Sequence, residues 1–327
     1  MLCRLNVQSR AKYLSVNWLR GEKSAHLVQN RSVTYPPETR CDVSNNATPK
    51  PKNVDYFRVP RPMWRKIKKV LPKVPKKRGP GRPPADNRAV LNGIWYVLWT
   101  GCQWKAVHKD WFGVCSSTLH ERFQTWQQQG LFDHFLRIMV KYYAKKRKVK
   151  WKWQSIDSKS CPAPLGGEHT GNNPTDRGKR GSKIHLLVDQ RGAPLAVYIT
   201  GANCHDKWSA DDVIISMVIP RPDPADVEQH VCMDRGYDYP DVHQFVEQER
   251  YIAHIKHRRR RGEPLLEDCP VPGETQFPAR RWVVERTLGW LAKRRSLRIR
   301  WCKKVGNWLA FVQLACAHIL MDMAIYG

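Results

Sequence analysis

Three acidic residues stand out because each occupies a position suited to binding a metal ion. Asp157 ends the stretch WQSID and Asp234 ends HVCMD, and both stretches predict β-strands. Carboxylates at the ends of strands lie at a sheet edge, where α/β folds bind ligands. Glu285 lies in RRWVVERTLGWL, an apolar run without proline that predicts a helix. Any one of these acids alone is more often a turn residue or a helix cap, but three on separate elements indicate a shared site.

Glu285 has two candidate partners. At helical spacing it shares a face with Trp282 and Leu288, where an unpaired carboxylate is costly to bury. A salt bridge to Arg281, four residues earlier, is the ordinary explanation for a lone glutamate. A metal ion held jointly with the two aspartates is the alternative.

The charge of the chain bears on that alternative. Its 327 residues include 57 Lys and Arg against 29 Asp and Glu, a formal net charge of +28, which favours polyanionic partners such as nucleic acid. Carboxylates alone would repel DNA, so cations must lie between them. Two Mg²⁺ ions about 4 Å apart, held by oxygen ligands, can activate an attacking oxygen and neutralise the phosphate between them. The sequence therefore favours metal-dependent phosphodiester chemistry.

Composition divides the chain into four parts. Residues 1–60 are polar with Pro and Asn clusters, which predicts a poorly ordered extension. Residues 61–84 form a basic arm rich in Pro and Gly. Its end, KKRGPGRPP, is similar to a DNA minor-groove arm centred on Arg82, although a plain basic linker has nearly the same composition. Residues 85–148 predict a small helical DNA-binding domain, and residues 149–327 an α/β domain with a C-terminal helix.

Three helices are expected in the helical domain. Asp86 is positioned to cap the first and Gly101 to end it. The second begins in SSTLHERFQTWQQQG, where Thr118 and Glu121 have capping-box spacing, and its buried stripe is Leu119, Phe123 and Trp126. The third covers LFDHFLRIMVKYYAKK.

Three short helices beside a basic arm suggest a helix-turn-helix-like unit. The exposed face of the second helix would then contact DNA through His120, Arg122, Gln124 and Gln127. An ordinary three-helix bundle with a solvated face is the alternative.

The pattern changes after residue 150. SKIHLLVDQRGAPLAVYIT predicts a β-hairpin that turns at DQRG. The later strands HVCMD and YIAHIKH alternate with the helical stretches WSADDVIISMVI and YPDVHQFVEQER. Strands paired antiparallel and then alternating with helices predict a mixed α/β sheet.

The ordered set of motifs resembles bacterial insertion-sequence transposases of the DDE type, in the insertion-sequence-five family. The segments that carry it, between about Trp64 and Ile325, are RGPGRPPADNRAVLNGIWYVLWTGCQW, SIDSKSCPAP, DRGKRGSKIHLLVDQRGAPL, CMDRGYD and RRWVVERTLGWL. The resemblance implies a ribonuclease-H-like mixed sheet with flanking helices and the catalytic, metal-binding triad Asp157, Asp234 and Glu285. It also implies two Mg²⁺ or Mn²⁺ ions per active site. The DNA partners would be the terminal inverted repeats of the element and a target, bound by a homo-oligomer.

Further basic residues are candidate DNA ligands. Arg281 and Lys293, four residues before and eight after Glu285, match basic sites that contact DNA phosphates in the family. Lys179, Arg180 and Lys183 in GKRGSK are expected phosphate ligands, with a solvated loop as the alternative. His205 in NCHD is a candidate near the metals, or else a capping or core histidine.

Two bulk features bear on location. The ten cysteines are scattered without a C-x-x-C pair, and the N-terminus lacks a secretory signal, so we expect reduced thiols in a cytoplasmic protein that associates with the nucleoid. The apolar stretch 308–326 is interrupted by Gln313, His318 and Asp322, which favours a packed helix over a membrane span. The rivals to an active transposase are a repurposed copy that binds DNA without cutting it and a structure-selective nuclease on the same fold.

Overall fold

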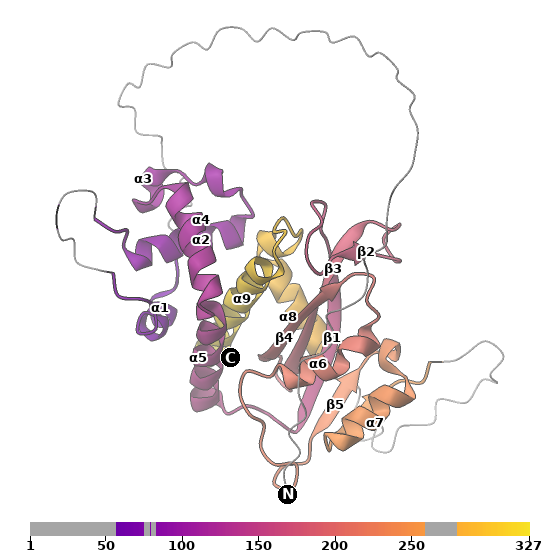
Figure 1. The fold of residues 1–327 in the computed structure, drawn as a ribbon. Helices are drawn as coiled ribbons and strands as arrows, with labels where there is room; N and C mark the ends of the chain where they lie inside the picture. The colour runs from indigo at the N-terminus through magenta and orange to yellow at the C-terminus, as the bar shows by residue number, and fades with distance from the viewer. Residues whose placement is uncertain (1–56, 75–78, 80–82, 259–279) are drawn as a thin grey trace, which may run out of the picture. The chain divides into compact units, whose positions relative to one another are not determined.

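The computed structural model describes residues 57–74, 79, 83–258 and 280–327 (Figure 1). Most of the expected N-terminal extension, and Arg82 in the basic arm, lie outside these residues. Within the expected arm, residues Arg61–Ile67 form helix α1 instead. Its Met63 and Ile67 lie one helical turn apart and are fully buried, so this part of the segment packs as a helix.

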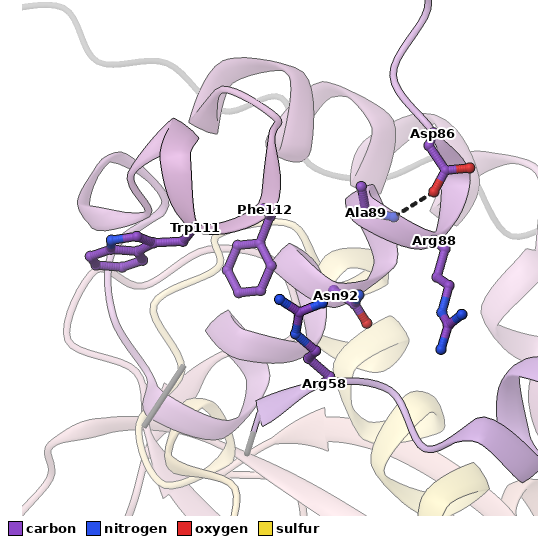
Figure 2. Close-up of a pocket in the computed structure, with 7 residues that line it drawn as sticks. All are labelled: Arg58, Asp86, Arg88, Ala89, Asn92, Trp111 and Phe112. Carbon is purple, nitrogen blue, oxygen red and sulfur yellow. Dashed lines mark hydrogen bonds between the residues drawn. The ribbon is translucent and has the colours of Figure 1, made fainter. Parts of the chain in front are cut away.

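The helical region contains the three predicted helices: α2 (Asn87–Thr100), α4 (Ser116–Gln128) and α5 (Leu131–Arg147). The turn η2 (Trp104–Ala106) and the short helix α3 (Lys109–Phe112) lie between α2 and α4. As predicted, Asp86 caps α2 by accepting a hydrogen bond from Ala89 N at 2.9 Å (Figure 2), and Gly101 ends it with a left-handed φ of 66°.

The N-cap of α4 differs from the prediction. The helix begins at Ser116, with Cys115 as its N-cap, so Thr118 lies within the first turn. The Thr118 hydroxyl is 3.0 Å from Cys115 Sγ, and hydrogen bonds from Ser117 and Thr118 lower the pKa of the Cys115 thiol to about 7. The buried stripe Leu119, Phe123 and Trp126 is as predicted.

The sheet is mixed, as predicted. Strand β3 (Arg180–Asp189) pairs antiparallel with β1 (Trp153–Pro162), β2 (Gly171–Asn172) and β4 (Pro194–Gly201), and the β3–β4 hairpin turns at DQRG. On its other side β1 pairs parallel with β5 (His230–Met233), which pairs parallel with β6 (Ile252–Ile255). This arrangement is the mixed sheet with flanking helices that the sequence predicts, and it agrees with the ribonuclease-H-like fold class that the family resemblance implies (Figure 1).

Helices follow the strands in the expected order. They are α6 (Ala210–Ile215), α7 (Pro240–Gln248), α8 (Trp282–Ala292) and α9 (Val305–Tyr326). Short 3₁₀ turns lie beside these helices: η3 (Asp206–Ser209) precedes α6, η4 (Arg235–Tyr237) precedes α7, and η5 (Arg295–Leu297) lies between α8 and α9. Helix α8, which carries Glu285, packs on β1 and β3, and α6 packs on β3 and β4.

Helix α9 joins the helical region to the sheet. It packs along α5 and also contacts β4. Within the part of the chain that the structure describes, it is the one helix long and apolar enough to cross a membrane, and 72% of its most apolar window is buried inside the protein. That packing agrees with the predicted core helix. Tyr143 of α5 adds a second link by donating a hydrogen bond at 3.0 Å to Asp189, a fully buried residue at the end of β3.

Candidate active site

The strand register brings the two aspartates to matching positions. The parallel pairing of β1 with β5 ends at Ser155 opposite Cys232. Asp157 and Asp234 each lie two residues further along, so both side chains leave the same face of the sheet at the end of this ladder. Asp234 follows β5 directly, as predicted. Asp157 does not end its strand, because β1 continues to Pro162 through its pairing with β3.

Glu285 is presented by the first turn of α8. The helix is fixed at both ends of its contact with the sheet. Ser155 Oγ donates to Arg280 O at 3.2 Å, and Thr287 Oγ1 donates to Gly192 O at 2.8 Å. Gly192, at φ 90°, allows this close approach, because a Cβ there would lie 2.7 Å from Thr287 Oγ1. These contacts therefore fix the position of Glu285 relative to β1.

The expected apolar surroundings of Glu285 are not observed. The buried face of α8 consists of Val283, Val284, Thr287, Leu288 and Leu291. Glu285 is exposed, and Trp282, which was expected to share a buried face with it, is 57% exposed. Leu288 faces the core and Glu285 is on the exposed side of the helix. The Glu285 carboxylate therefore stays hydrated and can contact other charged groups at little desolvation cost.

Arg281 links two of the three acids. Its Nε donates to Glu285 Oε1 at 2.9 Å, and its Nη1 donates to Asp234 Oδ1. Burial raises the pKa of Asp157 to about 6; the hydrogen bond from Ser158 N and the charge of Arg281 oppose the rise, and the charges of Asp234 and Glu285 add to it. The three carboxylates thus act on one another around a single guanidinium.

The donor chemistry fits Mg²⁺ or Mn²⁺, since all three acids supply oxygen ligands. Tyr237 gives a second indication. Its hydroxyl is buried without a hydrogen-bond partner among the described residues, and burial, followed by the charges of Asp206, Asp157 and Asp234, raises its pKa. A buried hydroxyl without a partner, close to carboxylates, is free to hydrogen-bond a polar ligand. No three His, Cys, Asp or Glu side chains in the described residues are arranged as a metal cage, and here Arg281 is the cation between Asp234 and Glu285.

A fourth carboxylate, Asp206, was not predicted from the sequence. Its Oδ1 accepts hydrogen bonds from Ser158 Oγ at 2.9 Å and from Lys183 Nζ at 3.0 Å. Ser158 is the neighbour of Asp157, so Asp206 lies beside the acidic site. Its position next to His205 in NCHD was the available signal.

Lys183 was expected in a loop that binds phosphate, and the structure places it within β3. Its side chain is 13% exposed, and it donates to Cys204 O at 2.7 Å as well as to Asp206. His205 caps η3, with its Nδ1 accepting from Lys207 N at 3.3 Å, in agreement with the capping alternative.

The remaining predicted DNA ligands fall into two groups. Lys179, Arg180 and Lys293 are exposed on the surface. His120, Arg122, Gln124 and Gln127 of α4 are half-buried, so each contacts both solvent and its neighbours, and their role as DNA ligands stays a prediction. Arg122 donates to Asn87 Oδ1 at 3.0 Å, and Gln124 lies 3.1 Å from a ring nitrogen of His120.

Comparison with known proteins settles the family. Residues 152–320 match the family described as "Transposase DDE domain", and residues 59–136 match the family described as "Putative transposase of IS4/5 family". The chain belongs to the DDE transposase family. The match to the DDE domain includes all three acids, and the match to the IS4/5 family includes α1 to α4.

Sequence relatives agree with this assignment. The chain is 37% identical over 169 residues to "Putative transposase for insertion sequence element IS402" of Burkholderia cepacia, covering 50% of this chain and 72% of the relative. An insertion-element IS402 protein of 16.2 kDa from the same organism is 29% identical over 114 residues, covering 34% of this chain and 78% of that protein. Solved structures similar to this transposase include the catalytic domain of Mos1 mariner transposase (10% identity, TM-score 0.28, 59% and 88% of the two chains) and the piggyBac transposase synaptic complex (10% identity, TM-score 0.41, 83% and 73%).

Proposed function

We propose that this DDE transposase binds the terminal inverted repeats of its own insertion sequence and cleaves their phosphodiester bonds. It then joins the exposed 3′-hydroxyl ends to target DNA by transesterification. The observation that carries the proposal is the arrangement of Asp234 and Glu285 on one guanidinium beside Asp157. The three acids come from a strand, a strand end and a helix, in a chain whose net charge is +28. Such a site suits cations that bind between the carboxylates and a polyanion.

Asp157, Asp234 and Glu285 would hold two Mg²⁺ or Mn²⁺ ions. The ions supply an activated water for hydrolysis and charge neutralisation at the phosphate. The chain's own residues position these ligands: the β1–β5 register sets Asp157 and Asp234 at matching positions, and Thr287 and Ser155 hold α8, whose Glu285 is linked to Asp234 through Arg281. The buried Tyr237 hydroxyl is a hydrogen-bond donor for a polar group bound among the acids.

Arg281 would change partners during this reaction. Its guanidinium neutralises Asp234 and Glu285 until cations take that role, and it then binds a DNA phosphate, for which its planar donor geometry is suited. Lys179, Arg180 and Lys293, which are exposed, would bind further phosphates. We place this reaction in the bacterial cytoplasm, with a homo-oligomer assembled on the DNA ends.

Incubation of the full chain with duplex DNA that carries the element's ends, in Mg²⁺, tests the proposal. We expect strand breaks at the ends that leave 3′-hydroxyl groups, followed by joining to a second DNA, and we expect chelation of Mg²⁺ to stop both. Binding of the ends without any cutting would indicate a repurposed DNA-binding protein. Cutting without preference for the ends would indicate a nuclease.

A further inference from the structure

The protein contains a pocket of about 630 Å³ whose lining includes none of the three carboxylate residues. It is lined by the end of α2 and η2, by one side of α4, by the β1–β2 loop and by residues 301–311. Its volume is that of a site for a small molecule or a nucleotide.

One wall of the pocket is aromatic. The Trp104 ring lies 5.1 Å from the His120 ring and 6.0 Å from the Phe311 ring, measured between centroids. Trp301 also lines the pocket and is 53% exposed, although a large aromatic side chain is normally covered. The pocket therefore presents flat apolar surfaces to a ligand.

Asn307 gives the pocket a polar group without a partner. The residue is 8% exposed, lines the pocket, and its Oδ1 has no hydrogen-bond partner among the residues that the structure describes. A buried acceptor left without a donor is destabilising, so such atoms usually serve a ligand or a water molecule. The ligand that fits would bring an N–H group.

The segment that carries Trp301 is held rigidly. Arg300, which is fully buried, donates to Cys302 O at 2.9 Å and to Lys303 O at 3.0 Å. Glu168 N donates to Lys303 O at 2.9 Å, and the Glu168 carboxylate accepts from Val305 N at 2.9 Å. Because the guanidinium of this buried arginine donates hydrogen bonds to backbone carbonyls of the loop, it fixes the loop in one conformation.

Two lysines at the pocket supply positive charge. Lys303 and Lys304 line it and are exposed, and Lys304 is the N-cap of the 22-residue helix α9, whose N-terminal dipole favours an anion. The Glu168 carboxylate is the negative group that faces the same helix end. Two lysines and the dipole outweigh it.

We propose that this pocket binds an unpaired nucleotide of single-stranded DNA. The base stacks on the aromatic side chains, an N–H group of the base donates to Asn307 Oδ1, and the adjoining phosphates bind Lys303 and Lys304. An apolar segment of a second copy of the chain would fill the pocket but would leave Asn307 unsatisfied and both lysines unused. The inference rests on the proposed action on DNA and adds a base-binding site to it.

The test compares two oligonucleotides of equal length and charge, one with bases and one fully abasic, by fluorescence anisotropy on the full chain. Because the phosphates are the same, the ratio of the two affinities isolates the bases. Stacking of one base contributes about tenfold in affinity, so we expect the wild-type ratio to be about ten. Trp301→Ala and Asn307→Leu should bring the ratio close to one, whereas Trp301→Phe should keep it.

Matched measurements separate binding from folding. Trp208 is also exposed, at 63%, and does not line the pocket, so Trp208→Ala should leave the ratio unchanged. Melting temperatures should be unchanged for Trp301→Ala and equal or higher for Asn307→Leu, since the leucine removes an unsatisfied acceptor.

Three results would overturn the proposal. One is a wild-type ratio near one with duplex DNA still bound, which leaves the proposed function intact. Another is an affinity ratio that stays unchanged in both pocket variants. If Trp301→Ala changes only the mass of the protein in sedimentation, the pocket binds a second copy of the chain instead. A chain that binds neither oligonucleotide nor duplex would overturn the proposed function as well.

Discussion

Arg281 donates a hydrogen bond to Asp234, which lies 47 residues earlier in the chain and at the end of a different element. The same guanidinium donates to Glu285 at 2.9 Å. The salt bridge and the shared acidic site, which were alternatives for Glu285 from the sequence, are therefore parts of one arrangement. A cation already lies between two of the carboxylates, and it is covalently attached to the helix that carries one of them.

Arg281→Ala tests whether this cation competes with metal. We expect Mg²⁺ to bind more tightly to the variant in calorimetric titration, because two carboxylates lose their guanidinium partner. The free energy of unfolding should change by only about 0–1 kcal/mol, since the side chains of Arg281, Asp234 and Glu285 are 40% to 47% exposed. Cleavage of end DNA should weaken, because a phosphate ligand is lost.

Arg286→Ala is the matched control for that variant. Arg286 lies on the same helix between the rings of Trp282 and Trp290, and it donates to Arg191 O, so its removal should leave Mg²⁺ affinity unchanged. Weaker Mg²⁺ binding in Arg281→Ala would contradict the competition. A large loss of stability with cleavage preserved would favour a purely structural salt bridge.

Lys183 and Lys179 carry the same charge but differ in burial, so the two lysines show whether burial decides the effect of losing that charge on stability. Lys183→Met should lower the free energy of unfolding by about 1–3 kcal/mol, because it leaves the part-buried Asp206 without its charged donor. Lys179→Met removes the same charge from an exposed side chain, 60% accessible, and should change stability by less than about 0.5 kcal/mol. Chemical denaturation measures both. Equal stability of the two variants would mean that Lys183 is a free phosphate ligand.

His318 should make stability depend on pH. It is buried on α9, its Nδ1 accepts from Arg294 Nη2 at 2.6 Å, and its Nε2 lies 3.5 Å from Asp322 Oδ2. Burial and then the charge of Arg294 lower its pKa to about 3. A folded pKa below the unfolded value of about 6.5 contributes stability that is complete above pH 6.5 and is lost as the pH falls towards 3.

The comparison with His318→Gln isolates this contribution. Between pH 7 and pH 5 the wild type should lose about 2 kcal/mol of unfolding free energy more than the variant loses. Denaturation at the two pH values measures the difference. Parallel losses in the two proteins would show that His318 is not held neutral.

Local signals were sufficient for much of the fold. Asp86 and Gly101 mark the ends of α2, and DQRG marks the β3–β4 turn. Other boundaries depend on partners far away in sequence. β1 continues past Asp157 because residues 158–162 pair with β3 along the backbone, and a side-chain pattern does not reveal that pairing. Helix α1 was hidden because its two buried residues, Met63 and Ile67, lie among basic ones.

The site divides in the same way. The positions of Asp157, Asp234 and Glu285 after or within strong apolar patterns made them visible in the sequence. Asp206 and Lys183 bond to each other across 23 residues, so no local spacing joins them. The half-burial of Arg122 likewise depends on Asn87 of α2, a residue from another helix.

The central claim is that Asp157, Asp234 and Glu285 form one metal-dependent cleavage site. Asp157→Asn, Asp234→Asn and Glu285→Gln each remove an anionic oxygen ligand with little change of shape, and cleavage of end DNA in Mg²⁺, with binding measured alongside, tests all three. We predict that every variant binds end DNA with near wild-type affinity and that none cuts it. A variant that cuts at close to the wild-type rate would contradict the claim for that residue.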